Sequence, residues 1–292
     1  MERAAAMTQA ANEKSTMLVF DSGGTAAGAA AAAKQAIRAH AGIVIGPLLS
    51  IEVPAVLAIT RNTLPVITFS NDAALLDTGA FVFGITPRQT VSAILRYAAG
   101  RGVKRVAIGG GTGDWGRQAL VSGALVGKQL GIETWPLTPQ LLAVGADALP
   151  DAVLITNAAQ LVELAPAAAA QGVQLLAAMP SLDLSPEALR ALEGAWFAAP
   201  DPAGFAGFAH SFEERNGSRP GTITGLAYDA LNIVRQMRAG GGTDRSALLS
   251  ASGFKGVCGD VRFREDGSVA RSLAVLAVAG GQLRKVAASS VS

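Results

Sequence analysis

The sequence predicts an α/β protein made of two lobes, each built around a parallel β-sheet. Two apolar runs of strand length, at 43–50 and 65–72, end in small polar residues, and a helical segment at 51–61 lies between them. This order is typical of the βαβ unit of a parallel sheet. After Pro200 the alternation of strands and helices stops. Because one continuous sheet of so many strands would be unusual, we expect two lobes.

The expected elements follow one another regularly up to Pro200. A strand at 16–21 and a glycine turn lead into an alanine-rich helix, with Thr25 as its N-cap and Gly42 as its stop. Thr86-Pro87-Arg88-Gln89 has the spacing of a capping box, with proline at the first helical position. The other expected strands are 80–85, 105–108, 133–137, 152–156, 173–177 and 195–198, and the other expected helices are 87–100, 117–130, 158–171 and 186–192.

The last part of the chain has a different pattern. Two helices are expected, at 205–216 and 222–238, without a strand between them. Alternating apolar positions at 256–286, with turns at Asp266-Gly267 and Gly280-Gly281, predict antiparallel strands at the end of the chain.

Composition excludes several classes of protein. Half of the 292 residues are hydrophobic and 16% are charged, which predicts a substantial buried core. The net charge is +2 and the basic residues are scattered, so we expect no nucleic-acid-binding surface. Cys258 is the only cysteine, so no internal disulfide can form. No apolar stretch reaches about 18 residues without a charge or a turn former, so no membrane span is expected.

The N-terminal residues, Met1 to Met7, are expected to form part of a helix. They lack the basic leader and the long apolar core of a signal peptide, and no early cysteine is present for lipid attachment. Three explanations stay open: an export segment has been removed, the recorded start is too late, or the protein stays in the cytoplasm.

Polar residues at the strand ends are the candidate ligand contacts. In a parallel sheet, ligands bind beyond the carboxyl ends of the strands. Ser50 and the turn Ser70-Asn71-Asp72 stand at such ends by chain order. Ser50 is also consistent with a helix N-cap, where backbone N–H groups attract anions. The turn is also consistent with Asn and Asp side chains that bond to their own backbone.

Several motifs, taken together in order, resemble one known family. They are Phe20-Asp21, Gly46-Pro47 with Ser50, Pro65-Val66-Ile67, Phe83 with Pro87, 103–108, Asp114-Trp115-Gly116, Tyr228-Asp229-Ala230, and Gly256, Gly259, Phe263 and Asp266-Gly267. The chain is similar to the type I periplasmic binding proteins, in particular to the leucine/isoleucine/valine-binding receptors of ABC importers. The sequence Thr68-Phe69-Ser70-Asn71-Asp72 is even more similar to the branch of penicillin-binding-protein activators, which regulate peptidoglycan synthases.

The resemblance implies a fold of two Rossmann-like lobes with parallel sheets, joined by a three-crossing hinge. The family begins with a strand that ends in a Pro-Leu-Ser/Thr-Gly turn, and this chain starts after it. The first strand of lobe one, with its ligand contacts, is therefore expected to be missing from this numbering. The implied boundaries are 1–86 and 199–258 for lobe one, 87–198 and 259–292 for lobe two, with crossings near Ile85, Ala199 and Gly259.

The resemblance also implies a function. It points to a non-enzymatic solute-binding protein of amino acid transport, in the periplasm or cell envelope and without a cofactor, that closes its lobes on a small ligand. The partners would be that ligand and the membrane subunit of an ABC importer. In the alternative branch the partner would be a peptidoglycan synthase. Ser50 would hold the carboxylate of the ligand, as in the amino-acid receptors.

Three further residues are site candidates in lobe two. Trp115, where the family usually has tyrosine, would stack over the ligand, or it packs as a rim aromatic. Asn157 follows the strand at 152–156 and is either a helix cap or a polar contact. Asp183 is the nearest acidic partner for an ammonium group, and nothing in the sequence directs it inward.

A nucleotide-binding enzyme is a remote alternative. The segment 111–116 matches G-x-G-x-x-G between a strand and a helix. However, Glu133 stands at the start of the next strand, whereas a ribose-binding acid stands at its end. His40 and His210 are the only histidines, so we expect no metal site, and a Ser-His-Asp triad would need one of them to meet a serine at a strand end.

Asp72 gives an expectation about the ligand. If its carboxylate points into the cleft, it repels the carboxylate that Ser50 would attract. We therefore expect a neutral or cationic ligand, or none, and weak or absent binding of leucine, isoleucine and valine.

Overall fold

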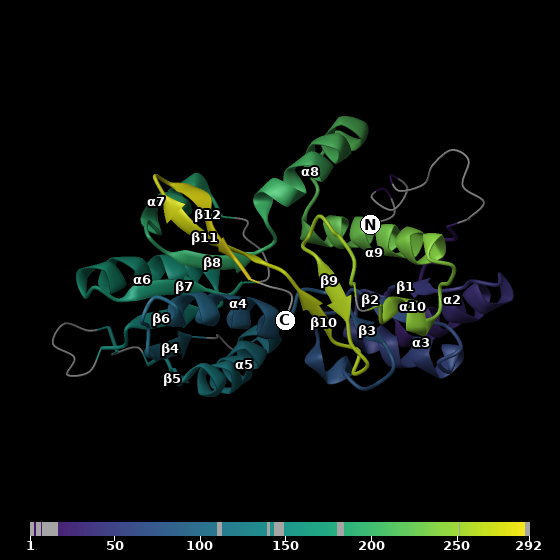
Figure 1. The fold of residues 1–292 in the computed structure, drawn as a ribbon, viewed down its shortest axis with the longest axis horizontal. Helices are drawn as coiled ribbons and strands as arrows, with labels where there is room; N and C mark the ends of the chain where they lie inside the picture. Colours follow the sequence, from purple (N-terminus) through teal and green to yellow (C-terminus); the bar gives the residue numbers. More distant parts are fainter. Residues whose placement is uncertain are drawn as a thin grey trace. The chain divides into compact units, whose positions relative to one another are not determined.

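The computed structural model of the chain describes residues 3, 7, 17–109, 113–138, 141–142, 149–179, 184–250 and 252–289. The chain forms two compact units (Figure 1). Unit 1 comprises Met1–Gly84 and Pro200–Ser272, and most of the remainder forms unit 2, Ile85–Ala199 and the residues from Leu273. The expected helix at the N-terminus lies outside the described residues, except for Arg3, which is helical, and Met7.

Unit 1 contains a three-stranded parallel sheet in the order β1-β2-β3. Its described elements are α2 (Ala26–Arg38), β1 (Val44–Ile45), η1 (Ser50–Glu52), α3 (Val53–Thr60), β2 (Val66–Thr68), η2 (Ala73–Leu75), β3 (Phe81–Val82), α8 (Pro202–Asn216), α9 (Thr222–Ala239), α10 (Arg245–Leu248), β9 (Val261–Phe263) and β10 (Val269–Arg271). Thr25 caps α2 as expected, because its hydroxyl accepts the N–H of Gly28 at 3.0 Å. The expected βαβ unit between 43 and 72 is present as β1, α3 and β2.

The expected strand at 16–21 is not formed by its described residues. Residues 17–20 have no regular secondary structure and pair with none of the described strands. Leu18 and Val19 are 49% and 57% exposed. An apolar run becomes a strand only where a neighbouring strand satisfies its backbone groups, and here such a neighbour is not among the described residues.

Unit 2 contains a seven-stranded sheet in the order β12-β11-β8-β7-β6-β4-β5. Strands β4 to β8 are parallel to one another, and β11 is antiparallel to both β8 and β12. Its described elements are α4 (Pro87–Ala99), β4 (Arg105–Gly109), α5 (Asp114–Leu130), β5 (Glu133–Pro136), β6 (Ala152–Ile155), α6 (Ala158–Ala170), β7 (Gln174–Ala177), α7 (Pro186–Ala191), β8 (Trp196–Ala199), β11 (Ala274–Ala279) and β12 (Gln282–Ala288). The capping box of α4 is confirmed, with Thr86 and Gln89 bonded reciprocally.

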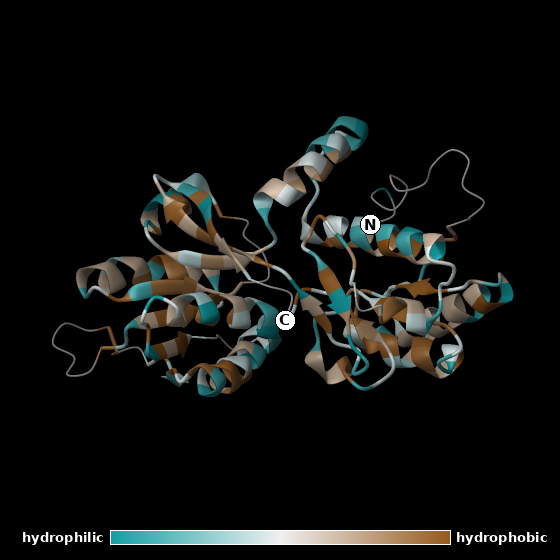
Figure 2. Cartoon of the chain, in the orientation of Figure 1, coloured by the Kyte–Doolittle hydropathy of each residue, from teal (hydrophilic) through white to brown (hydrophobic). Residues whose placement is uncertain are grey.

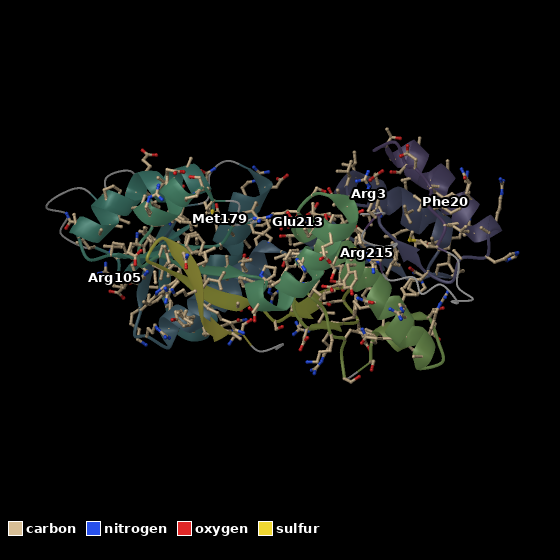
Figure 3. All side chains as sticks on the ribbon, turned by 90° about the horizontal axis from the view of Figure 1, so that it is seen from above. Arg3, Phe20, Arg105, Met179, Glu213 and Arg215 are labelled. Atoms are coloured by element: carbon tan, nitrogen blue, oxygen red, sulfur yellow. The ribbon has the colours of Figure 1, made fainter. Side chains whose placement is uncertain are left out.

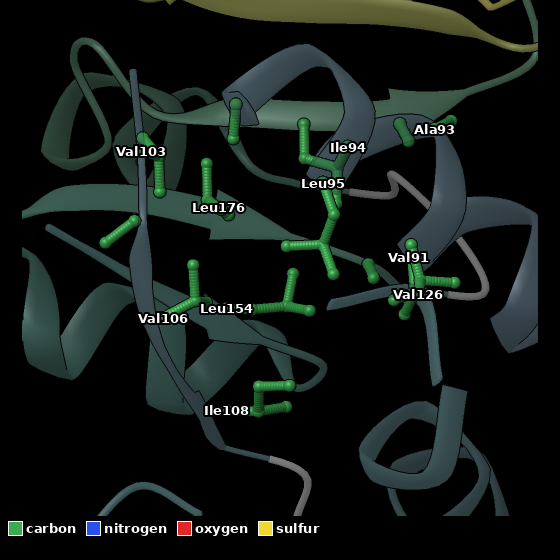
Figure 4. Packing of buried hydrophobic residues seen from close by; sticks show 14 of the residues in the cluster. Val91, Ala93, Ile94, Leu95, Val103, Val106, Ile108, Val126, Leu154 and Leu176 are labelled. Atoms are coloured by element: carbon green, nitrogen blue, oxygen red, sulfur yellow. The ribbon is translucent and has the colours of Figure 1, made fainter. Parts of the chain in front are cut away.

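Two hydrophobic clusters cover the two faces of this sheet. Val106 and Leu154 lie in the cluster that packs under α4 and α5, as Figure 4 shows for α4 residues such as Ile94 and Leu95. Ala107 and Val153, the neighbours of Val106 and Leu154 in the chain, lie in the cluster under α6. Successive strand residues point to opposite faces, so strands buried on both faces are apolar throughout, as the brown strands in Figure 2 show.

The antiparallel strands expected after Gly256 divide between the units, with β9 and β10 in unit 1 and β11 and β12 in unit 2. The β9–β10 hairpin belongs to unit 1, because Phe263 packs against Phe81 and Phe83 of β3 and its flank, at ring-centroid distances of 5.2 and 5.8 Å. The chain passes from one unit to the other after Gly84, Ala199 and Ser272. The third passage thus lies beyond the expected position near Gly259.

None of the helices in the described part of the chain is long and apolar enough to cross a membrane.

Candidate functional site

Ser50 lies just beyond the carboxyl end of β1, at the first position of η1. The N-cap of η1 is Leu49, so Ser50 does not act as the cap. The Ser50 side chain is half-buried, and its hydroxyl makes no hydrogen bond with the described residues. A hydroxyl without a partner at a strand end is free to bond to a ligand.

Glu52, two residues further on, was not among the sequence candidates. It is 2% exposed, and its Oε2 accepts the backbone N–H of Leu49 at 3.4 Å. Its Oε1 is buried without a hydrogen-bond partner among the described residues. A buried carboxylate oxygen without a donor is costly, so this end of β1 favours groups that donate hydrogen bonds over anions.

The turn Ser70-Asn71-Asp72 lies at the same edge of the sheet as Ser50. Strands β1 and β2 are parallel neighbours, and the backbone N–H of Phe69 donates to the Pro47 carbonyl at 3.0 Å. The structure therefore brings these candidates of unit 1 together.

The side chains of this turn are occupied mainly by the turn itself. The Ser70 side chain is buried, and its Oγ accepts the N–H of Asp72 at 3.2 Å. Oδ1 of Asp72 accepts the N–H of Ala74 at 3.0 Å and so caps η2. Asp72 is half-buried and Asn71 is exposed. The self-bonded Asx turn is thus present, and it leaves the second carboxylate oxygen of Asp72 unused by this cap.

Trp115 is fixed by a hydrogen bond within unit 2. It is the second residue of α5, and its indole N–H donates to the carbonyl oxygen of Ala178 at 2.7 Å, just after β7. The side chain is half-buried. This bond holds the ring at the carboxyl edge of the unit 2 sheet, where it can serve either as a stacking wall or as a rim aromatic.

Asn157 lies at the same edge, after β6, which is the neighbour of β4. It is the N-cap of α6, because its Oδ1 accepts the N–H of Gln160 at 3.0 Å. Met179, labelled in Figure 3, follows β7 and is buried. The loop after it, with Asp183, lies outside the described residues.

The described residues contain no group of His, Cys, Asp and Glu that could hold a metal ion. His210 lies on α8 with its Nε2 3.2 Å from Glu214, one turn further along the helix. Of the G-x-G-x-x-G segment, residues 111 and 112 lie outside the described residues, and Gly113 is the N-cap of α5. Glu133 begins β5 and approaches Arg105 at 4.0 Å, so it does not occupy the position of a ribose-binding acid.

In a comparison with protein families, the model of the periplasmic binding protein family matches residues 2–282. The chain belongs to this family. No curated protein sequence matches the chain.

Solved structures support the same fold of two lobes. One is a candidate branched-chain amino acid ABC transporter from Rhodospirillum rubrum, 21% identical, with a TM-score of 0.82 over 98% of this chain and 94% of the other. A second is the solute-binding protein of an ABC transporter from Rhodopseudomonas palustris BisB5, in complex with 3,4-dihydroxybenzoic acid. It is 18% identical, with a TM-score of 0.68 over 99% of this chain and 92% of the other.

A third structure comes from the regulatory branch of the family. It is the LpoA C-domain from Haemophilus influenzae, a regulator of PBP1A, 14% identical with a TM-score of 0.73 over 98% of this chain and 93% of the other. The resemblance read from the sequence is therefore confirmed, and the fold is shared by binding proteins for different solutes and by a regulator. Likeness at these identities concerns the fold, so the role of this periplasmic binding protein must be argued from its own residues.

Proposed function

We propose that this periplasmic binding protein is a non-enzymatic solute receptor that closes its two lobes on a small ligand. The observation that carries the proposal is the unengaged hydroxyl of Ser50, which lies beside the turn 70–72 at the carboxyl ends of two neighbouring parallel strands. Trp115 and Asn157 stand at the equivalent edge of the other unit and would supply the second wall. A ligand held by both walls stabilises the closed state by its differential affinity for it.

The ligand is expected to be neutral or cationic. Glu52, two residues after Ser50, has a buried carboxylate oxygen without a hydrogen-bond donor among the described residues. Asp72, at the end of the neighbouring strand, has a half-buried carboxylate. Neither Lys nor Arg occurs at 46–52 or 69–72 to neutralise an anion. An amide, a sugar or an amine matches this set of acceptors better than a carboxylate does.

A thermal-shift screen over amino acids, sugars, amides and amines tests the receptor function. A ligand that binds only the folded protein raises the free energy of unfolding by RT ln(1 + [L]/Kd) and so raises the melting temperature. At least one neutral or cationic compound is expected to give a concentration-dependent increase that is reduced in Ser50→Ala. No shift with any compound of these classes would count against the proposal.

The second candidate function is a regulator of a peptidoglycan synthase in the cell envelope. Two observations favour this function: the structural similarity to the LpoA C-domain and the sequence of residues 68–72. Such a protein would bind its partner through an outer surface, whereas a receptor would deliver its ligand to the membrane subunit of an ABC importer. Either role belongs in the periplasm or cell envelope. Capture of a purified peptidoglycan synthase, together with no shift in the screen, would favour the regulator.

Nicotinamide nucleotides test the remote enzyme alternative in the same assay. Because the acid at the end of β5 is lacking, NAD and NADP are expected to leave the melting temperature unchanged. An increase with either nucleotide would reopen the enzyme alternative.

A further inference from the structure

Arg271 is a buried arginine in unit 1, next to the last residue before the chain leaves that unit. It is 5% exposed. Its Nη2 donates to the carbonyl oxygen of Phe83 at 2.8 Å, and its Nη1 donates to the carbonyl oxygen of Cys258 at 3.2 Å. The guanidinium carbon lies 4.7 Å from the centre of the Phe83 ring. One side chain therefore bonds to two backbone segments that are far apart in the sequence.

Asp229 on α9 also binds the second of these segments. The Asp229 side chain is 1% exposed. Its two carboxylate oxygens accept the N–H groups of Val257 and Cys258 at 2.7 and 2.9 Å. The loop at 256–259 is thus fixed by an anion that binds its N–H groups and a cation that binds one of its carbonyls. Arg271 and Asp229 also compensate each other's charge in a buried setting.

The same loop is joined to the end of the hairpin. The backbone N–H of Ser272 donates to the carbonyl of Asp260, and the N–H of Asp260 donates to Oγ of Ser272, both at 2.9 Å. A Cβ added at Gly259 would overlap with the carbonyl oxygen of Ser272. Ser272 is therefore fixed to the residue that follows this loop by two hydrogen bonds.

Two of the three passages between the units start from this cluster. The chain leaves unit 1 after Gly84, the neighbour of Phe83, and after Ser272, the neighbour of Arg271. A carbonyl-bound guanidinium with two donors in fixed geometry orients both segments at once. The third passage enters unit 1 at Pro200, where Oδ1 of Asp201 caps α8 by accepting the N–H of Ala203.

We propose that Arg271 is a positioning residue that fixes the chain at two of its three passages, so that bending between the units starts beyond Gly84 and Ser272. This inference goes beyond the proposed function, because it holds for a receptor and for a regulator alike. Arg271 touches no ligand in this account. It sets where the hinge begins, because it keeps Phe83 and Ser272 fixed to unit 1 while the chain beyond them bends.

Hydrogen–deuterium exchange of the full chain tests the proposal in Arg271→Lys. An ammonium is a point charge that cannot reproduce the fork of the guanidinium, so one of the two carbonyl contacts is lost. The amides of Phe83, Gly84 and Ser272, which donate to Thr68, Ser70 and Asp260, are expected to exchange at least about tenfold faster. Amides of β6 in unit 2 are expected to keep the rate of the parent protein.

Val56→Ala is the matched control. Val56 lies on α3 and is buried in a hydrophobic cluster that does not include Arg271, so its truncation lowers the stability of unit 1 without removing a contact of Arg271. In this variant the exchange rates of the Phe83, Gly84 and Ser272 amides should increase no more than those of the other amides of unit 1. If Arg271→Lys leaves them unchanged, or speeds them only as much as the rest of unit 1, the positioning role is wrong.

Ser272→Ala keeps the proposal testable if Arg271→Lys does not fold. It removes the Oγ that accepts the N–H of Asp260 and leaves Arg271 in place. Exchange at Asp260 and Ser272 should then increase while Phe83 and Gly84 stay protected by Arg271. Equal loosening of Phe83 and Gly84 would contradict the proposal.

Discussion

At the scale of single residues, the hydroxyls of Ser50 and Thr25 differ in their hydrogen bonding. Thr25 caps α2, whereas the hydroxyl of Ser50 makes no hydrogen bond with the described residues. Ser50→Ala is expected to change the free energy of unfolding by less than about 0.5 kcal/mol. Binding of a ligand found in the screen should weaken about fivefold, because a hydrogen bond to the ligand is worth about 1 kcal/mol.

Thr25→Ala is the control for this prediction. It removes a real cap and should cost about 1 kcal/mol without changing ligand affinity. Urea unfolding and calorimetry measure the two effects. A loss of stability in Ser50→Ala as large as that in Thr25→Ala would show that Ser50 is structural.

Cys258 should be an inert thiol in the folded protein. It is completely buried, and burial raises its pKa well above the usual range, reinforced by the nearby carboxylate of Asp229. Because the thiolate is the reactive form, a thiol reagent at pH 8 is expected to modify Cys258 only after unfolding. An exposed cysteine introduced by Ala58→Cys should react at once in the native protein. Rapid modification of Cys258 without denaturant would contradict the burial.

At the scale of elements, the turn at Gly259 should tolerate no side chain. Its φ is +105°, and an added Cβ would overlap with the Ser272 carbonyl. Gly241 in the same unit has a φ of +97° with nothing within 4 Å of such a Cβ. Gly241→Ala should cost about 1–2 kcal/mol from backbone strain alone, and Gly259→Ala clearly more, because the overlap adds to that strain. Equal urea midpoints for the two variants would show that the turn can shift.

Local chemistry explains which elements could be predicted from the sequence. The capping box at Thr86, the N-cap at Thr25 and the apolar run of β6 each carry their signal within a few residues. The run at 17–20 carries the same apolar signal but has no partner strand among the described residues, and pairing is a property of the neighbours. The third passage follows Ser272 where the sequence predicts it near Gly259, because the sequence does not show which unit Phe263 packs against.

The candidate site was only partly predictable for the same reason. Chain order alone brings Ser50 and the turn 70–72 to one edge, because carboxyl ends of neighbouring parallel strands meet there. That Asp72 caps η2 and that Trp115 bonds to Ala178 depends on side-chain geometry. The burial of Glu52 could not be predicted from the sequence, because glutamate at the start of a helix is normally exposed.

At the scale of the whole molecule, the charge of the site should exclude branched-chain amino acids. A like charge at about 4 Å costs about 4 kcal/mol at an effective dielectric near 20, and solvent screening at half-buried Asp72 reduces this cost. Leucine, isoleucine and valine are therefore expected to bind weakly or not at all in calorimetry. Asp72→Thr, which retains a hydroxyl to cap η2, should gain affinity for them.

Asp244→Thr is the control for Asp72→Thr, because Asp244 caps α10 in the same manner and the change removes an equal charge from unit 1. It should leave the binding of branched-chain amino acids unchanged. Micromolar binding of leucine to the parent protein would refute the charge argument.

The closing of the two lobes on a ligand is the central claim, and it can be measured as a distance. Spin labels on Ala58→Cys in α3 and Ala124→Cys in α5, both exposed positions, report on the two units while Cys258 stays unlabelled. On addition of the compound with the largest thermal shift, the distribution of distances between the labels is expected to narrow and move, saturating at the concentration at which binding saturates. A bound compound that leaves the distribution unchanged would contradict the account.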